Sequence, residues 1–159
     1  MRRTVLLMRH AKSDWEADYG SDHDRPLNQR GVRSARSIGR LLVSEGIEPQ
    51  AVISSTALRA STTAELAMEA GGWQAELRLD PMLYDSGPHE VLLVGASTAP
   101  EVSRLMLVGH QPTWSALVKV LTGERIEMKT ASVAVVVVDL DSWAGLPDGT
   151  GSLSRVLTP

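Results

Sequence analysis

The chain has 159 residues, of which 43% are hydrophobic and 22% charged, a composition typical of one globular domain spanning residues 1–159. The net charge of −3, with no basic stripe interleaved with aromatic side chains, gives no support to nucleic-acid binding. Cysteine is absent, which excludes disulfides, thiolate catalysis and cysteine-ligated metals.

The amino terminus gives no sign of membrane targeting. Its apolar run is only a few residues long before it meets Arg9. Such a run is too short for the apolar region of a signal peptide or for a membrane span. We therefore expect a cytoplasmic protein that does not engage a membrane.

Strands and helices are predicted to alternate along the chain. In chain order, the pattern predicts a strand over 4–8, a polar loop over 11–27, a helix from Asn28 to about Gly46, a strand over 51–53, a helix over 57–70 capped within 54–56, a strand over 75–79, a helix over 88–96, a strand over 104–108, a helix from Pro112 to Gly123, a strand over 133–140 and a final short edge strand after Gly149. This order predicts an α/β fold, with a mostly parallel central sheet covered by helices on both faces as a three-layer α/β/α sandwich.

The residues able to do chemistry follow the predicted strands. The pair Arg9-His10 follows the first strand, Arg59 begins the helix after the second, Asp85 follows the third and His110 follows the fourth. Ligands of parallel α/β sheets bind beyond the carboxyl ends of the strands. We therefore expect these side chains to meet at one edge of the sheet.

A histidine beside several arginines suits phosphoryl transfer. Neutral imidazole is a nucleophile available near pH 7, and it can carry the phosphoryl group between two steps. The charge on the phosphoryl oxygens can be neutralised by guanidinium groups, for which Arg9, Arg59 and Arg25 are the candidates. We therefore expect no metal and no cofactor.

Several motifs in this chain resemble the histidine phosphatase superfamily, the phosphoglycerate mutase-like group. They are residues 7–11 (Leu-Met-Arg-His-Ala), 54–60 (Ser-Ser-Thr-Ala-Leu-Arg-Ala) and 108–110 (Val-Gly-His). Residues 11–13 (Ala-Lys-Ser) and 21–31, together with the compact length, are similar to the small SixA-type phosphohistidine phosphatase branch. The resemblance covers about residues 4–140 and implies a phosphoglycerate mutase-like fold.

The resemblance implies a role for each matching residue. His10 would be the nucleophile that becomes phosphorylated, with Arg9 and Arg59 binding the phosphoryl group. His110 would be the second histidine of the phosphate pocket, and Arg25 an additional arginine of the small branch. Larger members use a carboxylate as the general acid, usually a glutamate, and here Asp85 is the nearest candidate.

Less specific interpretations remain for some residues. Arg25 could form an ordinary salt bridge within the run 22–24 (Asp-His-Asp), and Asp85 could cap a turn. The same run is a poor metal site, because adjacent residues point in different directions and no distal ligand matches it. The tryptophans are expected to pack in the core or at the rim, and Trp15 and Trp114, which flank the motifs, could wall the pocket.

The predicted function is a metal-independent phosphatase acting through a phosphohistidine on His10. A protein phosphohistidine is the expected substrate: its imidazole can leave as a neutral ring, whereas an ester releases an alkoxide that needs an acid. The alternatives are a phosphatase for small phosphorylated metabolites, such as sugar or nucleotide phosphates, and a binding module that recognises phosphorylated partners without turnover. Retention of both histidines argues against the binding module.

Overall fold

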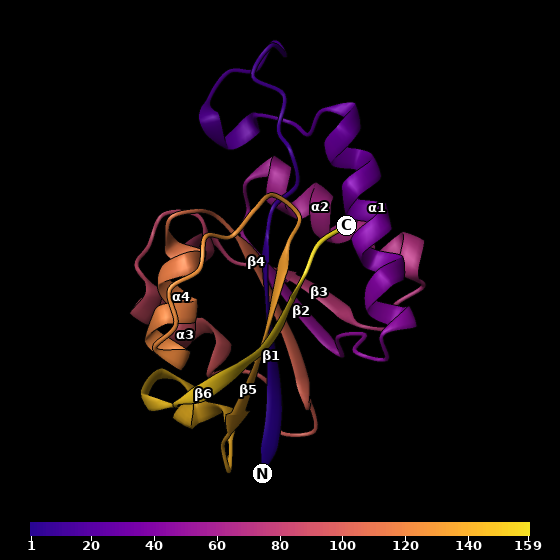
Figure 1. Ribbon diagram of the computed structural model, residues 1–159. Helices are drawn as coiled ribbons and strands as arrows, with labels where there is room; N and C mark the ends of the chain where they lie inside the picture. Colours follow the sequence, from indigo (N-terminus) through magenta and orange to yellow (C-terminus); the bar gives the residue numbers. More distant parts are fainter.

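Strands and helices alternate along the chain, as the hydrophobic pattern predicts. The computed structural model describes residues 1–159 (Figure 1). The strands are β1 (Arg2–Arg9), β2 (Ala51–Ser54), β3 (Glu76–Leu79), β4 (Arg104–Gly109), β5 (Val133–Asp139) and β6 (Gly151–Leu157). The α-helices are α1 (Gln29–Ser44), α2 (Leu58–Gly71), α3 (Pro88–Gly95) and α4 (Thr113–Thr122), and three short 3₁₀ helices are η1 (Asp22–Asp24), η2 (Pro81–Leu83) and η3 (Trp143–Asp148).

The six strands form one mixed sheet in the order β3-β2-β4-β1-β5-β6. Strands β1 to β4 are mutually parallel, whereas β5 is antiparallel to β1 and β6 is antiparallel to β5. Helices cover both faces, with α1 and α2 on one side and α3 and α4 on the other (Figure 1). The predicted three-layer α/β architecture with a mostly parallel sheet is therefore confirmed.

Two hydrophobic cores lie on opposite faces of the sheet because successive side chains of a strand point to opposite sides. In β1, Leu6 and Met8 pack in the core beneath α1 and α2, while Val5 and Leu7 pack in the core beneath α3 and α4. All four side chains are completely buried. The unbroken apolar run of β1 is thus that of a central strand covered on both faces.

Helix α1 packs closely against α2 through Gly39. A Cβ atom added at Gly39 would overlap the backbone of Ala67, and the Trp73 indole Nε1 donates to the carbonyl oxygen of Gly39 at 3.1 Å. The helix begins as predicted, with the Asn28 side chain accepting a hydrogen bond from the Gly31 amide at 2.8 Å. These contacts fix α1 against α2 and define where the helix begins.

The start of α2 differs from the prediction of a side-chain cap within residues 54–56. Ala57 is the N-cap and supplies no side-chain hydrogen bond. The Ser55 hydroxyl accepts from the Ala57 amide at 3.1 Å instead, in the turn just before the helix. Ser55 therefore stabilises the turn and remains within reach of the neighbouring strand β4.

Strand β4 lies between β1 and β2 and brings distant parts of the chain together. Arg9 at the end of β1 is paired in register with Gly109 at the end of β4, and Ser54 of β2 is paired with Val108. The residues that follow these three strands consequently emerge side by side at one edge of the sheet. None of the helices is long and apolar enough to cross a membrane.

Candidate active site

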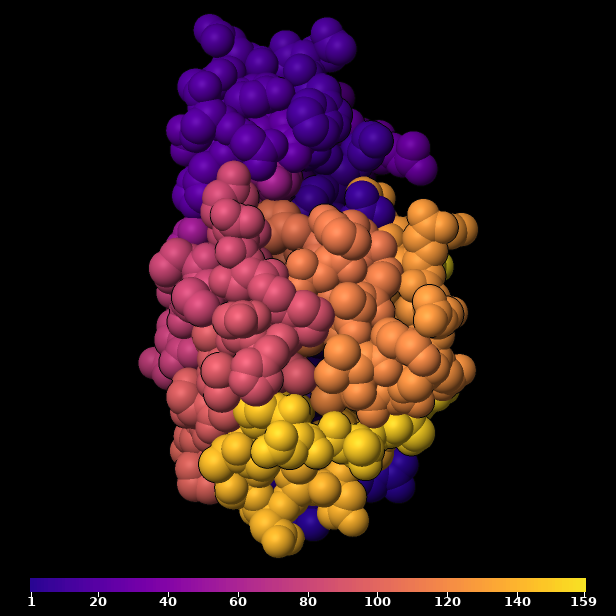
Figure 2. Space-filling view, turned by 90° about the vertical axis from the view of Figure 1, so that its left-hand side faces the viewer, coloured from indigo at the N-terminus to yellow at the C-terminus, as the bar shows by residue number.

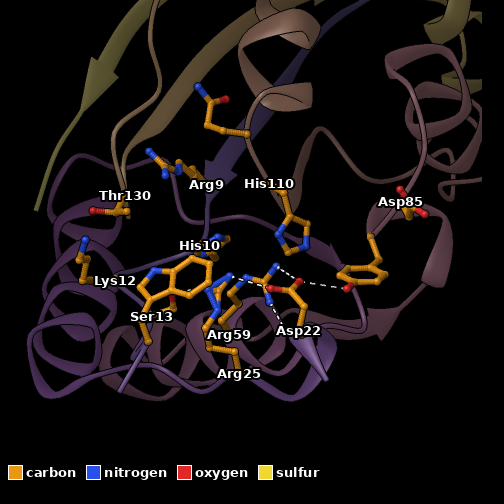
Figure 3. Close-up of a pocket in the computed structure, with 13 residues that line it drawn as sticks. Arg9, His10, Lys12, Ser13, Asp22, Arg25, Arg59, Asp85, His110 and Thr130 are labelled. Carbon is orange, nitrogen blue, oxygen red and sulfur yellow. Dashed lines mark hydrogen bonds and ion pairs between the residues drawn. The ribbon is translucent and has the colours of Figure 1, made fainter. Parts of the chain in front are cut away.

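A cavity of about 440 Å³ opens at the carboxyl ends of the parallel strands, where polar and charged side chains converge (Figure 3). Its lining residues come from segments spread over most of the chain; they are Arg9, His10, Lys12, Ser13, Trp15, Asp22, Arg25, Arg59, Tyr84, Asp85, His110, Gln111 and Thr130. All six predicted site residues, Arg9, His10, Arg25, Arg59, Asp85 and His110, are among them. The sheet edge predicted from the sequence is therefore where these side chains meet.

His10 is held by one hydrogen bond of its main chain and one of its ring. Its amide donates to the Gly109 carbonyl at 2.9 Å, and its Nδ1 lies 2.7 Å from the Ala11 carbonyl oxygen. Because a carbonyl oxygen only accepts, Nδ1 must carry the proton. The lone pair of the neutral ring therefore resides on Nε2, the nitrogen available for attack.

The surroundings of His10 keep the ring uncharged. The pKa of His10 is lowered from 6.5 to about 4, mainly by burial and also by the charges of Arg59, Arg9 and Arg25, against the opposing effect of the hydrogen bond to Ala11. The side chain is only 8% exposed. At neutral pH the imidazole is therefore in its nucleophilic form.

His110 faces His10 across the cavity, with ring centroids 5.1 Å apart. Its Nε2 lies 2.8 Å from the Ser55 hydroxyl oxygen, which already accepts a hydrogen bond from the Ala57 amide. The Ser55 hydroxyl proton is free to point at Nε2, and the neutral ring then carries its proton on Nδ1. Burial lowers the pKa of His110 to about 3, helped by the proximity of His10 and Arg59, so this ring is neutral as well.

Asp22 is the counter-ion of the pocket, and sequence reasoning did not identify it as a site residue. Arg59 donates from Nη2 to its Oδ2 at 2.9 Å, and Arg25 Nη2 lies 3.2 Å from Oδ1. The Tyr84 hydroxyl donates to Oδ2 at 3.0 Å. Although burial opposes the charge, hydrogen bonds from Arg59 and Tyr84 and the two positive charges hold the pKa of Asp22 below its ordinary value. The carboxylate thus occupies arginine donors that could otherwise bind an anion.

Arg25 is buried between the loop that carries it and the ring of Trp15. Its Nη1 donates to the Ser13 hydroxyl at 3.1 Å, and its guanidinium carbon lies 3.5 Å from the Trp15 ring centroid. This stacking is a cation–π contact, and the indole is 64% exposed at the mouth of the cavity. Arg25 therefore both lines the pocket and forms the predicted alternative, a salt bridge to Asp22.

Arg9 and Arg59 point into the cavity with part of their donor capacity unused. Arg9 Nη1 donates to the Met128 carbonyl at 2.9 Å, while the Nε atoms of both residues are buried and have no partner. Burial also lowers the pKa of Arg9 below its ordinary value, and the charge of Glu127 partly offsets this effect. Arg9 Nη2 makes no hydrogen bond within the protein, so this guanidinium group is suited to an anionic ligand in the cavity.

Asp85 lines the cavity at its rim, away from the predicted nucleophile. Figure 3 shows it well apart from His10, Arg59 and Asp22. It is exposed and makes no side-chain hydrogen bond. The prediction that Asp85 follows the third strand is correct, whereas its role as a general acid stays a prediction.

The two tryptophans that flank the motifs take the two places considered for them, the core and the pocket wall. Trp114 is completely buried in the core, where its Nε1 donates to the Leu107 carbonyl at 3.0 Å and its ring fills the space beside Gly109. Only Trp15 of the two lies at the cavity. The signal in the sequence was Gly109 directly before His110, because a glycine in a buried strand leaves room for a large side chain such as that of Trp114.

The run 22–24 is engaged in protein contacts. Asp22 binds arginines, and the His23 Nε2 lies 2.8 Å from the Thr56 hydroxyl. No group of three or more histidine, cysteine, aspartate or glutamate side chains in the structure has an arrangement that could hold a metal ion.

Known proteins share both the sequence and the fold. A Mycobacterium tuberculosis protein of unassigned function is 37% identical over 157 residues, which cover 92% of this chain and 96% of that protein. A candidate phosphohistidine phosphatase SixA from Nakamurella multipartitia superposes with a TM-score of 0.88 at 30% identity, covering 100% of this chain and 97% of its own. A candidate SixA from Agrobacterium tumefaciens gives 0.81 at 29% identity, covering 99% and 98%.

The family follows from the sequence match together with this structural likeness. Residues 5–88, more than half of the chain, match the histidine phosphatase superfamily (branch 1). The phosphoglycerate mutase-like fold implied by the motifs is confirmed by the superpositions. The chain belongs to the histidine phosphatase superfamily, in its SixA-type branch.

Proposed function

We propose that the protein is a phosphatase that transfers a phosphoryl group to His10 Nε2 and then to water, with a protein phosphohistidine as its substrate. The observation that carries the proposal is the state of His10: a buried, neutral ring whose Nε2 is unprotonated, surrounded by three arginines. Such a nitrogen can attack phosphorus, and fixed guanidinium groups can balance the charge of the phosphoryl oxygens.

The reaction is balanced in two displacements. In the first, the Nε2 lone pair of His10 forms a bond to phosphorus while the substrate P–N bond breaks and its electron pair returns to the leaving imidazole. In the second, a water oxygen attacks phosphorus and the bond to Nε2 breaks. The lone pair returns to His10, and one water proton is taken up by the released phosphate. Arg9 and Arg59 would bind the phosphoryl oxygens throughout, and His110 Nδ1–H would donate to one of them.

The leaving group favours a P–N substrate. An alkoxide needs a proton from an acid, but Asp85 stands exposed at the rim and the pKa of Asp22 is lowered. An imidazole protonated on its distal nitrogen leaves as a neutral ring and does not need that acid. The two candidate SixA structures, at about 30% identity, add support from relatives.

Small phosphate esters are the second candidate, and one observation favours them. Asp85 does line the cavity, so a carboxyl group stands at the rim of the space that a bound ester would fill. In that case Asp85→Asn would lower ester hydrolysis and leave P–N hydrolysis unchanged.

The test compares substrates and variants in the presence of a chelator. Wild type, His10→Ala and, as a matched control, His89→Ala at an exposed position in α3 are incubated with a histidine-phosphorylated protein and with a panel of phosphate esters. We expect phosphate release from the phosphohistidine, loss of at least about 10³-fold in His10→Ala, and no loss in the control. Activity retained in His10→Ala would refute the nucleophile, and much faster ester hydrolysis would refute the substrate.

A further inference from the structure

The solvent side of α1 carries four arginines and is called here the arginine face: Arg30, Arg33, Arg36 and Arg40, all exposed. At 100° per residue they fall within an arc of about 120°. This arc lies opposite the buried side of the helix, which includes Ala35, Ile38 and Leu42 in its centre. The four guanidinium groups therefore share one outward surface.

No acidic side chain of the protein is paired with the arginine face. None of its four members forms an ion pair, and α1 contains no aspartate or glutamate from Gln29 to Ser44. Glu45, just beyond the helix, is paired with Arg155 at 3.2 Å, and the exposed Glu65 and Glu69 of neighbouring α2 reach none of the four.

This arrangement opposes the stability of the helix. Like charges three and four residues apart repel each other, and Arg30 in the first turn also opposes the helix dipole. Helix faces that are merely solvated usually mix both signs. The protein as a whole has a net charge of −3, so the arginine face does not reflect a general excess of basic residues.

The amino-terminal end of α1, which carries Arg30, lies close to the candidate active site through contacts of Asn28 and of the buried Gly31. The Asn28 amide donates to the Lys12 carbonyl at 3.0 Å, and Gly31 packs directly on the Lys12 backbone. Lys12 in turn lines the cavity. From Arg30 to Arg40 the helix extends by about 15 Å at 1.5 Å per residue. That length exceeds a small metabolite and suits a macromolecular surface.

We propose that the arginine face is a docking surface for an acidic surface of the protein that carries the phosphoryl group. The proposal rests on the proposed function and adds the kind of partner: a protein whose surface is acidic on one side of its phosphohistidine. Complementary charge selects that partner and speeds encounter. Nucleic acid is a poorer match, because the arginine face contains no aromatic side chain on which a base could stack.

The test uses two synthetic peptides with the same phosphohistidine, one flanked by a run of glutamates and the other by a run of lysines. Wild type is compared with the triple variant Arg33→Gln, Arg36→Gln, Arg40→Gln, in which glutamine preserves helix propensity. The matched control is Arg2→Gln, an exposed arginine at the opposite end of the sheet. Phosphoimidazole, a small P–N compound, reports the catalytic site alone.

We expect the triple variant to lose about tenfold in kcat/KM on the glutamate peptide, mainly through KM, because three exposed ion pairs are removed. Its rates on phosphoimidazole and on the lysine peptide should match wild type, as should all rates of the control. An equal loss on phosphoimidazole, or no loss on the glutamate peptide, would overturn the docking surface. So would tighter binding to duplex DNA or to phosphatidylserine vesicles than to the glutamate peptide.

Failure of the proposed function would be visible separately. If wild type released no phosphate from any phosphohistidine substrate, the enzymatic proposal would fall. Binding of the unphosphorylated glutamate peptide, followed by fluorescence anisotropy in low salt, then decides the docking surface by itself: weaker binding in the triple variant supports it, and unchanged binding overturns it.

Discussion

Lowering the pH from 7 to 5 is expected to leave His10 almost entirely neutral. With a pKa of about 4, about 90% of the rings are uncharged at pH 5, whereas an imidazole with the ordinary pKa of 6.5 would be only about 3% uncharged. The nucleophile concentration at pH 5 thus differs about 30-fold between the two cases. Burial is the main cause, and the charges of Arg59, Arg9 and Arg25 act in the same direction.

The titration can be followed residue by residue. Carbon–proton NMR signals of the histidine Cε1 positions, assigned with His10→Asn and His110→Asn, give one midpoint for each ring. We expect the midpoint of His10 near pH 4 and that of His110 near pH 3. A midpoint for His10 at or above pH 6 would refute the inference that the resting nucleophile is kept uncharged by its surroundings.

The same shift predicts how stability depends on pH. The unfolded chain takes up the His10 proton near pH 6.5, but the folded protein resists it until about pH 4. The free energy of unfolding should therefore fall by about 3 kcal/mol on this account as the pH drops through that window. Urea unfolding of wild type should show this loss, and His10→Asn should lack it; identical pH dependence in both would contradict the assignment.

Three further substitutions test the packing and the polar contacts of the site. Ser55→Ala should shift the His110 proton away from Nδ1 and lower kcat about tenfold, whereas Ser55→Thr should keep both properties. The position of the proton is measured from the ¹⁵N chemical shifts of the His110 ring, and unchanged shifts in Ser55→Ala would contradict the prediction. Asp22→Asn should strengthen inhibition by inorganic phosphate about tenfold, since the arginines lose a competing carboxylate, and weaker inhibition would contradict that competition. Gly39→Ala should destabilise the fold by about 2 kcal/mol or more, because overlap of the new methyl group with α2 outweighs a gain of about 1 kcal/mol in helix propensity. The control is Gly20→Ala, whose methyl group would meet no neighbour. It should leave stability unchanged in the same thermal unfolding experiment.

The sequence predicted the elements and the edge of the sheet where the polar groups meet. Periodicity suffices for this because β1 is covered on both faces and α1 on one, so their apolar residues recur at fixed spacing. The pair Arg9-His10 and His110 directly follow predicted strands. The carboxyl ends of parallel strands meet at one edge of the sheet independently of loop conformation, so these residues could be placed together.

The partners of these groups could not be predicted in the same way. Asp22 and Tyr84 reach the site through loop geometry, and they lie 62 residues apart in the sequence. Loop conformations depend on tertiary contacts that leave no periodic signal. Burial of Trp114 likewise depends on the space beside Gly109, which only the packed structure reveals.

The position of β4 between β1 and β2 has a consequence for biosynthesis. Until residues 104–109 leave the ribosome, β1 has no partner strand, because both of its neighbours in the sheet lie later in the chain. The two histidines, although adjacent in the finished protein, can meet only when this last parallel strand inserts. Pairing across so many residues is slow compared with local structure. Catalytic competence should therefore appear late during folding, and its onset would report closure of the centre of the sheet (Figure 1). Figure 2 shows the face on which the segments of α3 and α4 cover that centre in the finished protein.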